Sequence, residues 1–146
     1  MKSVHKSVLI WYSAEEMFDL VTDVPAYPKF LPWCDEAQVL ARDEHDMKAR
    51  IGIAFSGIHQ SFTTHNRHVP GRRIHMSLVD GPFSSLEGQW DFTPVGEESQ
   101  RACKVELKLD YKFRSAALAA LVGPVFDRIA GSLVDAFVKR AEHVYG

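Results

Sequence analysis

The alternation of apolar and polar residues divides the chain into a long period-two region flanked by regions of helical period. Between residues 36 and 113 apolar side chains recur at every second position, and in 103–113 they alternate with charged ones. Such alternation gives a strand one dry and one wet face, which is typical of an antiparallel sheet. We predict six consecutive strands joined by short turns, at residues 36–43, 47–55, 58–69, 72–80, 86–93 and 103–113.

The N-terminal region predicts one further strand and two short helices. Residues 2–11 alternate and favour a strand. In SAEEMFDLVTD, residues 13–23, Ser13 and Glu16 have the spacing of a capping box and are followed by an apolar stripe at helical period. The stretch YPKFLPWC, residues 27–34, is interrupted by two prolines, so it permits only a short helical turn.

The C-terminal region, residues 115–145, returns to helical period and predicts one long helix, which Gly123 and Pro124 should kink or divide. The dry face of the sheet must receive this helix, and strand twist will curl the sheet around it. No linker or internal repeat divides the sequence, so we predict a single α+β domain, 1–146. Its curved seven-stranded antiparallel sheet wraps the long helix, leaving a tapering space with the two short helices at its open end.

Composition places few restrictions on function. The net charge is −2, with 46% hydrophobic and 25% charged residues, which is ordinary for a globular protein. We therefore expect no general attraction to nucleic acid, no DNA partner and no transmembrane segment, and we expect the chain to be cytoplasmic. Cys34 and Cys103 form no C-x-x-C pair and are expected to be buried thiols.

The sequence contains no recognised catalytic or metal-binding pattern. G-x-S-x-G, H-E-x-x-H, Walker and G-x-G-x-x-G motifs are missing. His65 and His68 should point to opposite faces of their strand, and His59 and His65 should lie roughly 20 Å apart, too far to share an ion. We assign no catalytic residue and no metal ligand. An enzyme of the cyclase kind stays open, because cavity shape and a single acid could suffice.

Three stretches carry a resemblance to a known family: VPAYPKFLPWC (24–34), HVPGRRIHMSLVDGPFSSLEGQWDF (68–92) and VDAFVKRA (134–141). They resemble the coenzyme-Q-binding START-type family, which includes the RatA-type ribosome-association toxins and belongs to the polyketide cyclase/dehydrase superfamily. The resemblance covers essentially the whole chain. It implies a helix-grip fold, START/Bet v 1-like, with an internal hydrophobic cavity that binds ubiquinone or a similar polyprenyl lipid and supports respiratory electron transfer. For the RatA-type branch it implies binding to the large ribosomal subunit and blocking of subunit association.

We place first the non-enzymatic binding of ubiquinone or a related lipid, which is a ligand rather than a required cofactor. The RatA-type role comes second and a polyketide cyclase/dehydrase-like enzyme third. The ligand-binding candidates are Tyr27, Phe30, Leu31, Trp33, Phe55, Phe62, Trp90, Phe92, Tyr111 and Phe126. Two interpretations stay open for them, contact with a ligand or simple filling of the core. The 27–34 segment is likewise either a lid or a packed cap.

The predicted strand 58–69 places Gln60, Thr64 and Asn66 on the same side as Phe62. Buried polar groups need partners, so they would meet the polar head of a ligand or, at the mouth of the sheet, water. Each buried isoprene unit offers roughly 3–4 kcal/mol against an association cost of ~4–15 kcal/mol, so two or three units plus a ring would suffice. A pocket of ~300–1,000 Å³ would leave the rest of a long tail outside, where transient membrane contact is open.

The ribosomal alternative needs a basic surface, because RNA binding depends on phosphate contacts. Lys104, Lys108 and Lys112 alternate with acidic residues and suggest a balanced face. We therefore take a cluster near the VPG turn as the ribosome-binding candidate: Arg67, Arg72 and Arg73. The alternative is that these arginines are only solvated turn residues.

Overall fold

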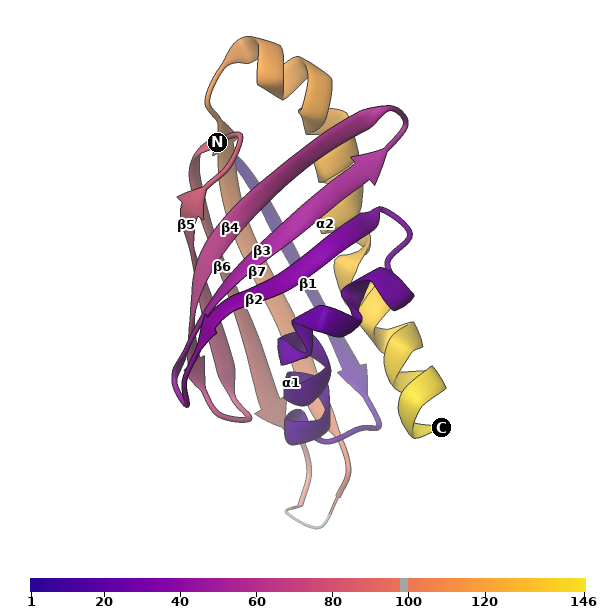
Figure 1. The fold of residues 1–146 in the computed structure, drawn as a ribbon. Helices are drawn as coiled ribbons and strands as arrows, with labels where there is room; N and C mark the ends of the chain where they lie inside the picture. Colours follow the sequence, from indigo (N-terminus) through magenta and orange to yellow (C-terminus); the bar gives the residue numbers. More distant parts are fainter. Residues whose placement is uncertain (98–99) are drawn as a thin grey trace.

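A computed structural model, which describes residues 1–97 and 100–146, contains one antiparallel sheet curled around a long helix (Figure 1). The elements in chain order are β1 (Lys2–Ile10), α1 (Ala14–Thr22), the 3₁₀ helix η1 (Val24–Lys29), β2 (Cys34–Arg42), β3 (Asp46–Phe55), β4 (Ile58–Val69), β5 (Arg73–Asp80), β6 (Phe83–Pro94), β7 (Cys103–Phe113) and α2 (Ala116–Tyr145).

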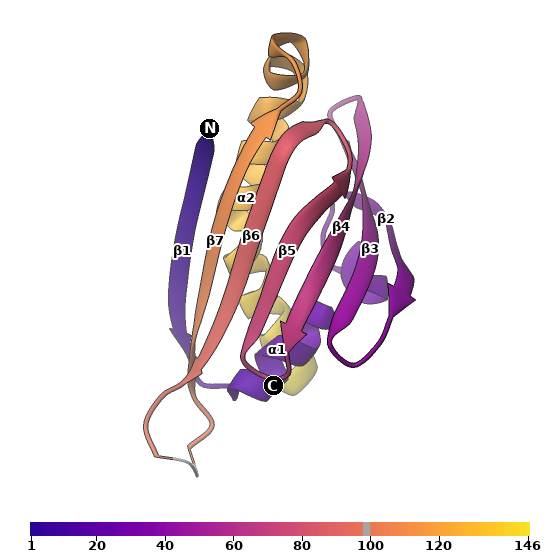
Figure 2. The ribbon, with the colours of Figure 1, turned by 90° about the vertical axis from the view of Figure 1, so that its left-hand side faces the viewer.

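The seven strands are ordered β1-β7-β6-β5-β4-β3-β2, and every neighbouring pair is antiparallel. Strands β2 to β7 form the predicted meander, and β1 adds to its far edge beside β7, as Figure 2 shows. The predicted α+β helix-grip fold is therefore confirmed.

Strand β6 begins at Phe83, three residues before the predicted start. The register of β6 against β7 shifts between Phe83 and Ser85, which marks a β-bulge. A bulge places an extra residue in one strand and breaks the period-two pattern. For this reason alternation alone did not reveal the first part of the strand.

Helix α2 provides the second wall of the interior. One side of it is buried against the sheet along Val122, Phe126, Ile129, Ala130, Val134, Phe137 and Ala141. Pro124 lies inside the helix without dividing it, and Figure 1 shows the first, orange turns at an angle to the yellow remainder. By length and apolar composition α2 could cross a membrane. In this fold, however, it is the core helix, and the apolar residues named above are buried.

The two short helices lie where the sheet opens. Helix α1 has the predicted capping box, in which Ser13 accepts a hydrogen bond from the Glu16 amide and Glu16 accepts one from the Ser13 amide. The second helix begins earlier than predicted, at Val24, with proline in its first turn. The Tyr27 hydroxyl donates to the Val21 carbonyl and fixes η1 against the end of α1.

Candidate functional site

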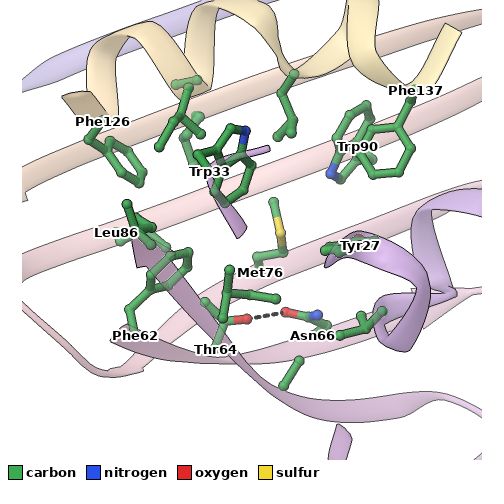
Figure 3. A pocket seen from close by; sticks show the side chains of 18 residues that line it. Tyr27, Trp33, Phe62, Thr64, Asn66, Met76, Leu86, Trp90, Phe126 and Phe137 are labelled. Atoms are coloured by element: carbon green, nitrogen blue, oxygen red, sulfur yellow. Dashed lines mark hydrogen bonds between the residues drawn. The ribbon is translucent and has the colours of Figure 1, made fainter. Parts of the chain in front are cut away.

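An interior cavity of about 100 Å³ lies between the concave face of the sheet and α2 (Figure 3). Eighteen residues line it, and nearly all of them are apolar. Its aromatic walls come from four parts of the fold: Tyr27 from η1, Trp33 from the connection to β2, Phe62 and Trp90 from the sheet, and Phe126 and Phe137 from α2.

The aromatic rings that surround the cavity support each other. Phe137 meets Tyr27 and Trp90 edge to face, with ring centroids 5.5 Å apart in both pairs. Phe62 approaches Phe126 in the same way at 6.2 Å. Such contacts are worth about 0.5–1.5 kcal/mol each beyond the area they bury, so the cavity walls are held in one arrangement.

A row of polar side chains on β4 faces the same interior. Thr64, Asn66 and His68 occupy successive inward positions, and all three are more than nine-tenths buried. The Thr64 hydroxyl donates to the Asn66 side-chain oxygen at 2.8 Å (Figure 3). A smaller cavity of about 20 Å³, lined by Asn66 and His68, shares five lining residues with the main one.

His68 has an unmet hydrogen-bonding capacity. Within the described part of the chain its Nε2 is buried and has no partner. Burial, with a smaller contribution from Arg42, lowers the pKa of His68 below its usual 6.5, so the ring is neutral at neutral pH. It can donate or accept one hydrogen bond toward the interior without carrying charge.

The structure brings half of the predicted ligand-binding residues to the cavity: Tyr27, Trp33, Phe62, Trp90 and Phe126. Phe92 and Tyr111 point inward but are fully buried in the surrounding core. Leu31 is buried in the core and Phe30 is only partly buried, and both line an outer groove. Phe55, at the end of β3, is 36% exposed and lies under the Arg128 guanidinium.

Sequence reasoning did not include most of the aliphatic lining among the ligand candidates: Val24, Ala49, Ile51, Ile53, Leu109, Ile129, Ala130 and Leu133. Alternation in 47–55 and 3–4 spacing in α2 contained the signal for most of them.

The cavity is smaller than the ~300–1,000 Å³ that the sequence analysis assumed for a ligand pocket. A cavity of about 150 Å³ suffices for benzene, so this interior admits at most a group of single-ring size. A substituted quinone with isoprene units requires the walls to move apart.

The arginines near the VPG turn do not form a free basic patch. Arg72 pairs with Glu15 and Arg73 with Asp91, at 2.8 Å in each case, while Arg67 lies 3.7 Å from Asp46. Each predicted ribosome-binding arginine therefore has a carboxylate beside it, which reduces its attraction for phosphate.

A second concavity, the η1–α2 groove, lies on the outside, between residues 29–33 and the C-terminal half of α2. Its volume is about 640 Å³. The groove is lined by Lys29, Phe30, Leu31, Pro32, Trp33, Ser132, Asp135, Ala136, Lys139, Arg140 and His143. Trp33 lines both the groove and the interior cavity.

No metal site emerges from residues 1–97 and 100–146, because no three His, Cys, Asp or Glu side chains come together there. Cys34 and Cys103 are buried free thiols, as predicted, and burial raises the pKa of each to about 11. At neutral pH both are therefore protonated and poor nucleophiles.

Comparison with known proteins places these features in a family. The polyketide cyclase/dehydrase and lipid transport family matches residues 10–138. A Ribosome association toxin RatA from Vibrio cholerae is 47% identical over 100% of this chain and 99% of its own length. The mitochondrial coenzyme Q-binding protein COQ10 homolog B from Xenopus laevis is 28% identical over 97% of this chain but only 58% of its own length.

Solved structures share the fold at lower identity. The Zhui aromatase/cyclase from Streptomyces sp. R1128 is 16% identical, with a TM-score of 0.85 over 99% of this chain and 96% of its own. Proteins with this architecture thus include enzymes, toxins and binding proteins.

Proposed function

The chain belongs to the polyketide cyclase/dehydrase and lipid transport family, and we propose that it acts there as a RatA-type protein that binds the large ribosomal subunit and blocks subunit association. The full-length match to the Vibrio cholerae RatA carries this proposal. The quinone-binding relative is more distant and is matched over only part of its length, so the quinone hypothesis that the sequence analysis placed first now comes second.

The proposed role involves no catalysis and no cofactor. Within the described chain, the cavity is lined by apolar side chains and by the neutral groups of Thr64 and Asn66, with no carboxylate among them. An aromatase or cyclase needs a group that moves protons; burial raises the pKa of Tyr27 in the lining, and the His68 imidazole lines only the adjoining small cavity. A ribosomal partner also implies a cytoplasmic location.

The decisive experiment is sedimentation of the purified protein with separated large and small ribosomal subunits across a salt series. We expect co-sedimentation with the large subunit, reduced formation of the joined ribosome, and release as salt rises. Equal binding to both subunits, or no binding at low salt, would contradict the proposal.

A hydrophobic ligand in the interior is the second candidate function. The apolar cavity with its polar row on β4 supports it, because convergent polar groups in an apolar hollow suit a ligand with a polar head. The cavity volume favours a compact, ring-sized group over a polyprenyl chain.

Mass spectrometry of organic extracts, together with Trp fluorescence titration by a short-tailed quinone, tests this second function. Ala49 lines the cavity, so Ala49→Leu should fill it and abolish saturable quenching while far-UV circular dichroism stays unchanged. Equal quenching of both proteins would place the quinone elsewhere on the surface.

A further inference from the structure

The η1–α2 groove contains a concentration of positive charge that the overall composition hides. Three cations, Lys29, Lys139 and Arg140, line it against one carboxylate, Asp135, which gives a local charge of +2 in a chain whose net charge is −2. None of the three cations forms a salt bridge to any residue in 1–97 or 100–146. They differ in this respect from the arginines near the VPG turn, which are all paired.

Helix geometry gathers these groups on one side of the groove. Asp135, Lys139 and His143 follow each other at four-residue spacing, so they form a ridge along α2, and Arg140 lies beside it. Lys29 comes from the opposite wall, at the end of η1. The cations therefore line both walls of the groove, Lys29 on η1 and Lys139 and Arg140 on α2.

Two aromatic side chains line the groove. Phe30 and Trp33 line it and are only partly buried, and the Arg140 guanidinium lies 5.0 Å from the centre of the Phe30 ring. An arginine held over an aromatic ring keeps one planar face available, and guanidinium planes and aromatic rings are the surfaces on which unpaired bases stack.

We propose that the η1–α2 groove binds RNA of the large ribosomal subunit as an unpaired segment, with phosphates at Lys29 and Lys139 and a base against Arg140. This inference rests on the proposed function and assigns it a surface. Cationic rims that follow a phosphate backbone, together with stacking planes between them, are the usual means by which proteins hold single-stranded nucleic acid.

The groove fits RNA better than it fits a membrane. A lipid-binding surface presents large apolar side chains outward. None of the exposed large apolar residues of the described chain lines the groove, although Leu121 and Val144 belong to α2: they are Met1, Leu9, Trp11, Leu40, Phe55, Val69, Val79, Val95, Leu121 and Val144. Phe30 and Trp33 are partly buried and line the groove together with its three cations.

The test measures the affinity of the large subunit for the parent protein, two groove variants, a control variant and the variants Arg67→Gln and Arg72→Gln, as a function of salt. Neutralising both rims in Lys29→Gln/Lys139→Gln should weaken binding at least tenfold near 100 mM salt and reduce the slope of log K against log salt by about 1.4, the value for two contacts to an unpaired strand. Arg140→Lys keeps the charge but loses the planar group, so it should weaken binding severalfold and leave the slope unchanged. The matched control, Lys6→Gln on exposed β1, should bind within twofold of the parent.

The outcomes separate this inference from the proposed function. If the parent binds the large subunit and the groove variants bind equally well, the proposed RNA site in the groove is wrong, while the ribosomal role stands. If Arg67→Gln and Arg72→Gln instead reduce the slope of log K against log salt, the binding surface lies at the VPG turn.

If the parent binds no subunit, the ribosomal role fails, and a single-stranded RNA oligonucleotide becomes the deciding probe for the groove. Binding of that oligonucleotide that the double variant abolishes supports the groove as an RNA site. Binding to anionic vesicles without binding to the oligonucleotide overturns it in favour of a membrane.

Discussion

Glu16 joins three parts of the chain that are distant in sequence. Its carboxylate accepts the Ser13 amide at 2.9 Å and two hydrogen bonds from the Arg101 guanidinium, at 2.6 and 2.5 Å. Its carbonyl accepts the Tyr145 hydroxyl at 3.0 Å, and the Arg101 guanidinium lies over both the Tyr12 and Tyr145 rings. The start of α1, the approach to β7 and the end of α2 are thereby tied together.

These contacts predict an acid-dependent contribution to stability. The paired guanidinium lowers the pKa of Glu16 from its usual 4.5 to about 2. The contribution is therefore complete above pH 4.5 and is lost as pH falls toward 2, because the unfolded chain takes up the proton first. We expect Glu16→Gln to lower the free energy of unfolding at pH 7 by about 1 kcal/mol, measured by urea denaturation, with the difference vanishing near pH 2.

The control for that measurement is Glu44→Gln, since the Glu44 carboxylate is 82% exposed. It should leave stability unchanged at every pH. A Glu16→Gln deficit that persists undiminished to pH 2 would show that the ion pair is not its source.

At the scale of single residues, the sequence predicted which side chains face the interior better than it predicted which charged residues pair with each other. It correctly placed Phe62 and Trp90 toward an apolar interior, because alternation determines which face a strand residue occupies. It did not reveal that Arg73 faces Asp91 and that Arg67 faces Asp46, since both pairs depend on strand register. Register therefore pairs two of the three arginines, and Glu15 of α1 pairs with the third, Arg72.

Among the elements, two glycines occupy opposite environments. Gly81, in the turn between β5 and β6, has a φ of +148°, and a Cβ there would lie 2.6 Å from the Cβ of Phe62 and 3.2 Å from its Cα. Gly131, within α2, faces open space. The same substitution should therefore have opposite effects at the two positions.

We expect Gly81→Ala to destabilise the protein by about 1–3 kcal/mol, because it strains the turn and presses on the backbone of β4. Gly131→Ala should stabilise it by about 0.5–1 kcal/mol by removing a flexible residue from a helix interior. Urea midpoints of both variants against the parent provide the measurement. A loss of stability for Gly131→Ala would reveal a contact absent from this structure.

Helix and strand identities followed from periodicity, and the capping box marked the start of α1. The beginnings of η1 and β6 did not follow, because prolines and a bulge interrupt the period that the prediction uses. The η1–α2 groove was not predicted either, since it depends on how two separately predicted elements dock.

Considered as a whole molecule, the core is continuous. Its three clusters of buried side chains share members at their borders, with Trp33 and Phe62 each packing against two of them. Phe137 is 1% exposed and contacts Tyr27, Phe30 and Trp90. A core connected in this way favours a single cooperative unfolding unit.

We therefore expect coincident unfolding transitions by far-UV circular dichroism and Trp fluorescence, which would support the single domain 1–146. Phe137→Ala should lower stability by about 3–5 kcal/mol and shift both transitions together. Two separated transitions, in the parent or the variant, would mean that the sheet and the short helices unfold independently.

The volume of the interior cavity could not be predicted from the sequence. Whether rings such as Phe126 and Phe137 leave a gap depends on shifts of less than an ångström, which a pattern of apolar positions does not encode. The family resemblance implied a cavity, whereas its small size is a property of this packing.

Trp33 has one edge in the interior and another in the outer groove. A ligand that displaces the Trp33 indole as it enters the cavity must therefore also change the η1–α2 groove. If entry of the ligand changes the affinity for RNA by some factor, RNA must change the affinity for the ligand by that same factor. If both proposed functions hold, Trp33 would couple ligand binding in the cavity to RNA binding in the groove.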